Sequence, residues 1–291
     1  MDEKDYREWL SGYTEFDSCV HAFANQRQFF RVNTLKTEQE KFEEKTKIKC
    51  KKSKYYSLAY EVEEEIQIGK TIDYYLGHIY PQTLPSILVS LVLNPKPTDR
   101  VLDVAASPGS KFSHLAMLMD NKGVLVGNDQ KERISTLYAT INRMNVLNSI
   151  VTIRDGAKLD WKERFDKVLL DTPCTALGSG PEAWRRWKVE NSQKISAIQK
   201  KMLFSAYDAL VPGGELVYST CTYAKEENEE VVATLLENVP SAKIESIVLP
   251  VEIPHEQGIG ELGEELKKCY RIYPQHLESE GFFIAKIRKN E

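Results

Sequence analysis

Residues 101–112 read VLDVAASPGSKF, an apolar strand followed by a turn of small residues that opens a helix. A turn of this kind lets the backbone approach a ligand closely, and the free amides at a helix N-terminus can receive a carboxylate. The stretch lacks the G-x-G-x-x-G pattern of dinucleotide-binding enzymes. It predicts the first strand of an α/β sheet, with a ligand site at its C-terminal end.

Downstream of residue 100 the chain alternates short β-branched runs with longer helical patterns, which is typical of a parallel sheet built from βαβ units. Strands are predicted at 100–105, 123–128, 149–154, 165–171 and 214–220. Helices are predicted at 111–120, 131–145, 192–210 and 225–238. RIYP (271–274) and GFFIAKIRK (281–289) have no helix between them and predict an antiparallel edge. The expected fold class is α/β, with a doubly wound, mainly parallel sheet.

The first 75 residues have a different pattern. The strand-like QFFRVNTLK (28–36) and the alternating SLAYEVEEEIQI (57–68) lie on either side of a lysine-rich stretch, which is expected to be a helix. We therefore expect a small α+β domain at 1–75 and a large domain at 76–291. The segment at 77–93 is expected to join them through a helix that packs on the sheet.

The composition is that of a globular protein, with 42% hydrophobic and 28% charged residues. No run reaches the roughly 18 apolar residues of a membrane span, and the acidic start lacks the basic and apolar regions of a signal peptide. We expect a cytoplasmic protein without a membrane partner. The five cysteines show no C-x-x-C or Cys/His spacing, so neither disulfides nor a metal site are expected.

The net charge of −4 by itself argues against a nucleic-acid partner, because phosphate binding depends on lysine and arginine. Two basic runs stand out nevertheless: Lys45, Lys47, Lys49, Lys51, Lys52 and Lys54, and then Arg185, Arg186 and Lys188. Such runs are usually solvated surfaces. They become candidate RNA contacts only in combination with the motifs below.

An acidic residue stands at or near the end of each of the first four predicted strands: Asp103, Asp129, Asp155 and Asp171. Polar residues are common at strand C-termini in α/β folds, so one of them alone would mean little. Taken in order, however, Asp129 can accept both hydroxyls of a ribose and Asp155 can accept from an adenine amino group. The set predicts an adenosyl ligand with an amino-acid tail.

Two cysteines lie in the turns after the fourth and fifth strands, Cys174 in DTPCTALG and Cys221 in STCTY. Both are therefore expected at the edge of the sheet where the ligand binds. Carbon 5 of cytosine is a poor nucleophile, but a thiolate added to carbon 6 turns the ring into an enamine whose carbon 5 can attack a sulfonium methyl group. Asp171 is placed to supply or relay the hydrogen bond that ring nitrogen N3 then needs.

Buried cysteines are more often small apolar packing residues, and this interpretation applies to Cys19, Cys50 and Cys269. It fits less well for a cysteine in a turn between two threonines. From the residues alone, either of the two strand-end cysteines could be the nucleophile.

In combination, these motifs resemble those of the NOL/NOP/Sun family of RNA cytosine-5 methyltransferases, from Arg31 to nearly the C-terminus. The segments that carry the resemblance are RVNTLK (31–36), GHIYPQ (77–82), VLDVAASPGSK (101–111), DTPC (171–174), VPGGELVYSTCTYAKEENEEVV (211–232) and RIYPQHLESEGFFIAK (271–286).

The resemblance implies a class I (Rossmann-like) methyltransferase that uses S-adenosylmethionine. Its substrate would be RNA rather than DNA, first transfer RNA, as for short archaeal members, and second ribosomal RNA. We also expect a monomer. The catalytic residues would be Cys221, which attacks carbon 6, Cys174, which assists release of the methylated base, and Asp171. The cofactor contacts would be Ala105, Ala106, Ser107, Pro108, Gly109, Ser110, Lys111, Asp129, Arg133, Asp155 and Asp171.

The chain departs from the family pattern in the cofactor loop, where the usual C-A-A-P-G-G-K-T is A-A-S-P-G-S-K-F at 105–112. Asp129 also stands four residues before Arg133, where the family more often shows five, so Asn128 and Asp129 both remain candidates for the ribose contact. Two other functions remain open. One is a methyltransferase of the same fold that acts on a small molecule or a protein and does not need Cys221; the other is a non-catalytic RNA-binding or assembly factor.

Overall fold

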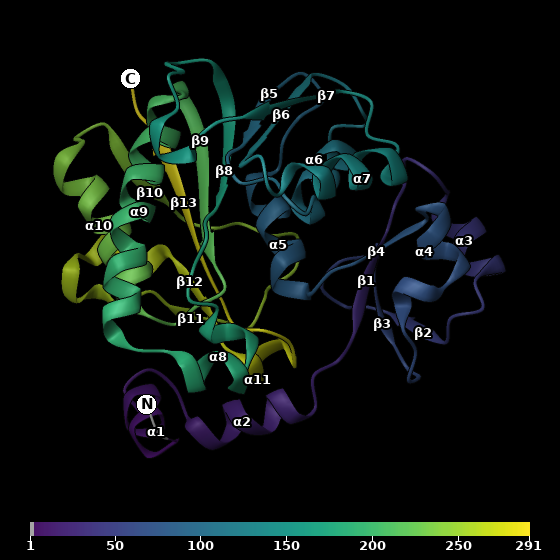
Figure 1. Ribbon diagram of the computed structural model, residues 1–291, viewed down its shortest axis with the longest axis horizontal. Coiled ribbons are helices and arrows are strands. Elements are labelled where there is room, and N and C mark those ends of the chain that lie inside the picture. Colours follow the sequence, from purple (N-terminus) through teal and green to yellow (C-terminus); the bar gives the residue numbers. More distant parts are fainter. Residues whose placement is uncertain (1–2) are drawn as a thin grey trace.

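The computed structural model describes residues 3–291 and contains a large and a small β-sheet (Figure 1). Within these residues the large sheet has nine strands, five of them in the α/β part: β5 (Arg100–Asp103), β6 (Val124–Asp129), β7 (Ser149–Ile153), β8 (Phe165–Asp171) and β9 (Leu210–Thr220). The C-terminal part adds β10 (Ala242–Glu245), β11 (Glu256–Gln257), β12 (Tyr270–Ile272) and β13 (Phe282–Lys289).

The strand order is β11-β12-β13-β9-β8-β5-β6-β7, and β10 also pairs with β13. The strands from β5 to β9 pair in parallel, whereas β13 runs antiparallel to β9. This confirms the doubly wound, mainly parallel sheet and its antiparallel C-terminal edge. The short strands β10 and β11 were not expected from the sequence, since neither is long enough to show a period-two pattern.

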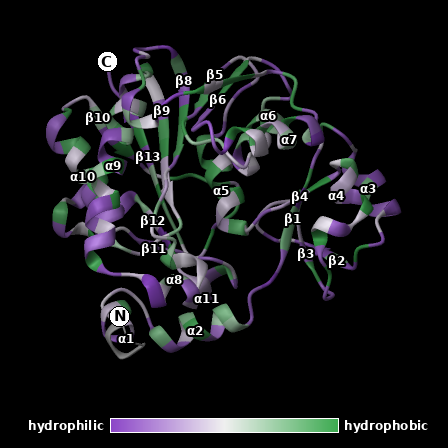
Figure 2. Cartoon of the chain, in the orientation of Figure 1, coloured by the Kyte–Doolittle hydropathy of each residue, from purple (hydrophilic) through white to green (hydrophobic). Residues whose placement is uncertain are grey.

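Helices cover both faces of the sheet. On one face lie α5 (Leu84–Leu93), α6 (Ser110–Leu118) and α7 (Ile134–Met144), and on the other lie α9 (Val189–Asp208) and α10 (Glu229–Asn238) (Figure 1). Each face has its own apolar core, one that includes Leu88 and Phe112 and one that includes Leu203 and Val231. Figure 2 shows the hydrophobic strands enclosed between these helix layers. As expected, α5 packs on the sheet.

Phe112, a departure from the family pattern, has a packing role. A Cβ atom at Gly127 of β6 would lie only 2.7 Å from the ring of Phe112. The large aromatic ring therefore occupies space that a side chain on β6 would otherwise fill. Burial of such a ring contributes to stability on the order of 2–3 kcal/mol.

The small sheet is antiparallel and confirms the small N-terminal α+β part. Its strands are β1 (Phe29–Val32), β2 (Cys50–Lys52), β3 (Ala59–Val62) and β4 (Ile79–Pro81), in the order β2-β3-β1-β4. It is accompanied by α3 (Gln39–Lys45) and α4 (Ile72–Leu76). The expectation of a lysine-rich helix is wrong for most of the lysines: α3 ends at Lys45, and Lys51 and Lys52 lie on β2.

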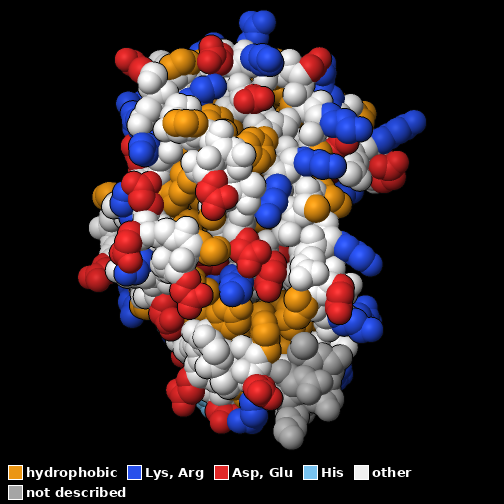
Figure 3. Space-filling view, turned by 90° about the vertical axis from the view of Figure 1, so that its left-hand side faces the viewer, with side chains coloured by type: hydrophobic (Ala, Val, Ile, Leu, Met, Phe, Trp, Pro, Cys, Tyr) orange, Lys and Arg blue, Asp and Glu red, His pale blue; other side chains and the backbone are white. Residues whose placement is uncertain are grey.

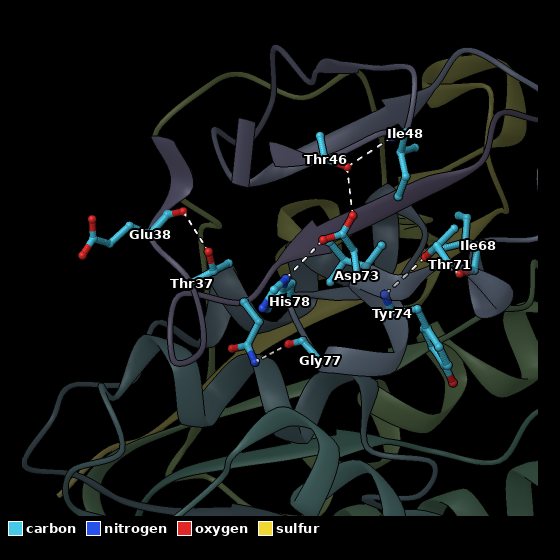
Figure 4. Close-up of polar contacts among 12 residues, drawn as sticks. Thr37, Glu38, Thr46, Ile48, Ile68, Thr71, Asp73, Tyr74, Gly77 and His78 are labelled. Atoms are coloured by element: carbon cyan, nitrogen blue, oxygen red, sulfur yellow. Dashed lines mark hydrogen bonds and ion pairs between the residues drawn. The ribbon is translucent and has the colours of Figure 1, made fainter. Parts of the chain in front are cut away.

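Polar contacts tie α4 to the rest of the small part (Figure 4). The Asp73 carboxylate accepts a hydrogen bond from the Thr46 hydroxyl at 3.0 Å and lies 3.1 Å from Nδ1 of His78. The Thr71 hydroxyl caps the helix by accepting from the amide of Tyr74. The chain that leaves α3 and the chain that enters β4 are thereby held together.

The division of the chain at residue 75 stays a prediction, because strands from both sides of that residue share the small sheet. In addition, the first two helices, α1 (Glu3–Ser11) and α2 (Phe16–Ala24), pack against elements of the large part. Tyr6 stacks on Trp184 of α8 (Pro181–Arg186), and α2 contacts α11 (Pro274–Leu277). No helix within residues 3–291 combines the length and apolar character that crossing a membrane requires.

Candidate active site

The acidic strand ends lie at one edge of the large sheet. Since β5, β6, β7 and β8 pair in parallel, Asp103, Asp129 and Asp171 end their strands on the same side, and Asp155 follows β7 by two residues. The chain runs outward from β5 through β6 to β7 and then returns to place β8 on the opposite side of β5. Such a reversal opens a crevice at the strand ends, where α/β proteins bind their ligands.

The loop after β5 is held by residues of β6 and α7. The Asp129 carboxylate accepts from the amide of Ser107 at 2.8 Å, and the Arg133 guanidinium donates to the Ser107 carbonyl oxygen at 2.5 Å. Gly109 has a φ of 105°, and a Cβ there would lie 2.7 Å from the Thr140 side chain. Only glycine fits at this position without a shift.

Asn128 and Asp129 differ in how much of their hydrogen-bonding capacity is free. The Asn128 side chain is buried; it donates to two backbone carbonyl groups, at Val104 and Arg154, and accepts from Thr152 and the Arg154 amide. Its hydrogen bonds are thus used in joining β5, β6 and β7. The Asp129 carboxylate accepts from two backbone amides and retains acceptor capacity for a ligand.

A cavity of about 340 Å³ lies between these strand ends and α9. Four of the expected cofactor residues line it, namely Ala105, Asp129, Arg133 and Asp155, together with apolar side chains such as Ile198 and Met202. Carboxylates beside an apolar wall suit a ribose joined to a flat heterocycle, so the residues fit an adenosyl ligand. Pro108 and Ser110 instead line a groove of about 770 Å³ toward the small sheet.

Lys111 pairs with Asp171 at the end of β8. Its Nζ lies 2.7 Å from Oδ2 of Asp171, and the Ser219 hydroxyl donates to Oδ1 at 2.6 Å. Burial alone would lower the pKa of Lys111, but the Asp171 carboxylate outweighs this effect and raises it. Lys111 therefore stays an ammonium group that fixes the Asp171 carboxylate in place. The sequence placed Lys111 in the cofactor loop, and no role was expected for Ser219, although it is the first residue of the STCTY motif.

The two cysteines expected at this edge lie together, with their Sγ atoms 3.2 Å apart. Both are free cysteines and are half-buried. The hydrogen bond with Cys221 raises the pKa of Cys174 well above its ordinary value, and burial adds to the effect. Cys174 therefore keeps its proton and can donate it toward the sulfur of Cys221.

Two further carboxyl groups lie near Lys111 and Asp171. Burial, together with the negative charge of Asp171, raises the pKa of Asp103 to about 8. Glu280 lines the groove toward the small sheet, accepts from the Thr83 hydroxyl, and has a pKa raised by burial. No pattern in the sequence marks Glu280 beyond its place before the G-F-F segment.

The basic runs lie at the surface, and both contain residues that are ion-paired with glutamates, such as Lys51 with Glu61 and Arg185 with Glu182. Lys51, Lys52 and Lys54 line a groove of about 430 Å³ between the small sheet and α11. Within it, Lys51 pairs with Glu61 and Glu63. Figure 3, which views the molecule from the side of α9 and α10, shows acidic and basic side chains interspersed.

Comparison with known proteins gives matches over most of the chain. Residues 90–288 match the sequence profile of the family described as "16S rRNA methyltransferase RsmB/F". The tRNA (cytosine(49)-C(5))-methyltransferase of Pyrococcus abyssi is 39% identical over 307 residues, which cover 99% of this chain and 97% of the relative. The ribosomal RNA small subunit methyltransferase F of Cronobacter sakazakii is 38% identical over 78% of this chain, which spans 48% of that relative.

Solved structures agree with these matches. NSun6 from Pyrococcus horikoshii with SFG superimposes with a TM-score of 0.87 at 26% identity, over 99% of this chain and 97% of that one. A methyltransferase homologue protein from the same organism superimposes with a TM-score of 0.80 at 31% identity, over 99% and 100% of the two chains.

Proposed function

The chain belongs to the RsmB/F family, whose members methylate carbon 5 of cytosine in RNA with S-adenosylmethionine, and we propose that its substrate is transfer RNA and its nucleophile Cys221. The observation that carries the proposal is the pair of sulfur atoms 3.2 Å apart beside the Asp171 carboxylate, at the edge of the sheet next to the cavity. Transfer RNA is favoured because the Pyrococcus abyssi relative, a tRNA methyltransferase, is matched over almost its whole length. Ribosomal RNA is the second candidate, since the matched ribosomal RNA enzymes are longer: the matching part covers 48% of the Cronobacter sakazakii enzyme and 62% of an Escherichia coli one.

Asp129 and Asp155 would hold the ribose and the adenine of S-adenosylmethionine in the cavity, and Arg133 would keep the loop after β5 in place. When bound there, the cofactor supplies an electrophilic methyl group on its sulfonium. The target cytosine has to leave its stack to reach this edge, which costs a few kcal/mol in a duplex and less in a loop.

Cys221 starts the reaction as a thiolate, whose sulfur forms a bond to carbon 6 of the cytosine. The electron pair of the C5–C6 double bond moves to C4–C5, the pair of the C4–N3 double bond moves to ring nitrogen N3, and N3 takes up a proton. Asp171, held by Lys111 and Ser219, is placed to supply or relay the hydrogen bond at N3. Carbon 5 is then nucleophilic.

Cys174 acts in release of the methylated base. The proton on carbon 5 passes to solvent water, its electron pair restores the C5–C6 double bond, and the bond from carbon 6 to Cys221 breaks with its electron pair on sulfur. Ring nitrogen N3 returns the proton that it took up. A thiol 3.2 Å from that sulfur can donate a hydrogen bond to the thiolate as it forms. The raised pKa of Cys174 keeps this proton available at neutral pH.

Substitution of the two cysteines tests the roles. Cys174→Ala should accumulate a covalent protein–RNA adduct on a denaturing gel, because attack still occurs and release is slow. Cys221→Ala should form none. The opposite pattern would overturn the role assignment. Bisulfite sequencing of transfer and ribosomal RNA after incubation with the wild-type enzyme identifies the substrate, and a product confined to ribosomal RNA would reject transfer RNA.

A further inference from the structure

Glu227 is a fully buried carboxylate that touches neither the cavity nor the two cysteines, yet it bonds the turn that follows Cys174. Its Oε2 accepts from the backbone amide of Thr175 at 2.9 Å, and its Oε1 accepts from the Thr175 hydroxyl at 2.5 Å. Ser192 and Gln199 of α9 donate to the same carboxylate at 2.7 and 3.3 Å. Four hydrogen bonds thus stabilise the buried carboxylate, which has no ion pair with a lysine or arginine among the residues that the structure describes.

The same hydrogen-bond chain reaches the other cysteine turn. The hydroxyl oxygens of Thr175 and Thr222 lie 3.0 Å apart, and these residues directly follow Cys174 and Cys221. Because the Thr175 hydroxyl donates to Glu227, it can only accept from Thr222. The network therefore has one direction, from Thr222 through Thr175 to the carboxylate, and it links the two turns next to their sulfur atoms.

Gln199 also bonds the turn that contains Cys174, since its side-chain amide donates to the carbonyl oxygen of Pro173 at 2.8 Å. The neighbouring residue Asn228 holds the second turn: its amide donates to the Thr222 carbonyl oxygen at 3.0 Å and its oxygen accepts from Thr220. The start of α10 therefore contacts the backbone on both sides of the pair of sulfur atoms.

We propose that Glu227 is a positioning residue that sets the distance between the Cys174 and Cys221 turns and thereby the rate at which the methylated base is released. The proposal rests on the cysteine roles proposed above. It follows from the geometry, because the carboxylate bonds both groups of Thr175 and reaches Cys221 only through Thr222. Loss of the carboxylate should therefore affect release by Cys174 more than attack by Cys221.

Glu227→Gln is the sharpest substitution, since it keeps the size of the side chain. At the Oε2 position its amide nitrogen would meet the Thr175 amide and the Gln199 side chain, so that a donor meets a donor. At the Oε1 position it would force the Thr175 hydroxyl to accept, which reverses the hydrogen bond with Thr222. We expect kcat to fall on the order of 10- to 100-fold, because small displacements of reacting groups have effects of this size. The KM for RNA should stay within about threefold, and the covalent adduct should accumulate.

Glu229→Gln is the matched control. Glu229 is equally buried and lies two residues away, but its carboxylate pairs with Arg271 and bonds neither Cys174 nor Thr175. We expect it to lower thermal stability without raising the adduct fraction. If the two variants show the same adduct fraction and the same kcat per folded protein, the proposal is overturned. If Glu227→Gln does not fold, Thr222→Val removes the hydroxyl link, and absence of any excess adduct in it would equally overturn the proposal.

Cys174→Ala, measured in parallel, separates this proposal from the proposed function. If Cys174→Ala forms no adduct, the cysteine roles are wrong, and the role of Glu227 is then decided by kcat and KM alone. A lower kcat at unchanged KM in Glu227→Gln but not in Glu229→Gln supports positioning, and equal losses reject it.

Discussion

Asp103 is a buried carboxyl group whose protonation should make folding depend on pH. Its folded-state pKa of about 8 lies above the value of about 3.9 expected in the unfolded chain. Between these two values the folded protein binds more protons at this site than the unfolded chain does, so the free energy of unfolding falls as pH rises and then levels off.

Asp103→Asn should remove this fall in the free energy of unfolding, because the amide does not titrate. We expect the difference in melting temperature between the variant and the wild type to shift in favour of the variant as pH rises from 5 to 8. Differential scanning calorimetry at both pH values measures the difference. Asp166 provides a control carboxylate. It lies at the start of β8 and is ion-paired with Arg100, and its pKa is lowered rather than raised. A constant difference between Asp103→Asn and wild type across this range would contradict the prediction.

At the scale of single residues, the sequence could predict the pairs that neighbouring strands bring together. Cys174 and Cys221 each follow a strand of one parallel sheet, and parallel strands end at one edge, so their proximity follows from the pattern. Glu227 could not be found in this way. It stands in the acidic run KEENEE, which reads as a solvated helix start, and only the packing of α9 and α10 buries it.

Among the elements, the turn at Leu177–Ser179 shows how the cysteine segments fit together. The amide of Gly178 donates to the Cys221 carbonyl oxygen at 2.8 Å, and the Gly178 carbonyl oxygen accepts from Gly281 at 2.9 Å. The first cysteine turn, the second cysteine turn and the start of β13 therefore meet at one glycine. A Cβ at Gly178 would lie 2.2 Å from the Gly281 oxygen and 2.8 Å from the Cys221 oxygen.

Gly178→Ala should therefore displace the Cys221 turn. Since the contacting atoms belong to backbone, they cannot move aside as a flexible side chain would. We expect the single-turnover rate constant of methyl transfer to fall at least on the order of 10-fold. Gly69→Ala is the control, because a Cβ there meets nothing within 4 Å. Single-turnover methyl transfer measures both variants, and equal rates would refute this view of the turn.

The elements themselves were predicted well where the hydrophobic pattern is regular. The first four parallel strands and the four helices predicted after residue 100 agree with the structure to within a few residues, and β9 begins four residues before its expected start, at Leu210. The lysine-rich stretch was expected to be a helix, but part of it forms β2. A strand of three residues is too short for an alternating pattern to distinguish it from a helix.

The whole molecule brings distant segments together in ways that no local pattern indicates. The first two helices pack against α8 and α11, and the Asn33 side chain donates to the Gly77 and Met144 carbonyl oxygens, which joins the small sheet to α7. Apart from the hydrogen bond to Gly77, these contacts depend on tertiary packing between segments more than 100 residues apart. The same arrangement places the lysine groove between the small sheet and α11, where RNA could reach both parts.

If RNA follows this groove, its lysines should differ in importance. Lys54 is exposed, lines the groove, and forms no ion pair in the part of the chain that the structure describes. Lys51 lines the same groove but is paired with Glu61 and Glu63, so binding of a phosphate there has to displace an existing partner. Removal of Lys54 should therefore weaken RNA binding more than removal of Lys51.

Lys54→Ala should raise the dissociation constant for transfer RNA and reduce the slope of log K against log salt concentration by about 0.7–1, the value for one lost phosphate contact. Lys51→Ala should change the slope by less. Filter binding at several salt concentrations measures both. Because neither residue lies near the cysteines, kcat at saturating RNA should be unchanged in both variants. An equal change of slope in the two variants would show that the pairing with glutamate does not restrain Lys51, and no change in either would place the RNA outside this groove.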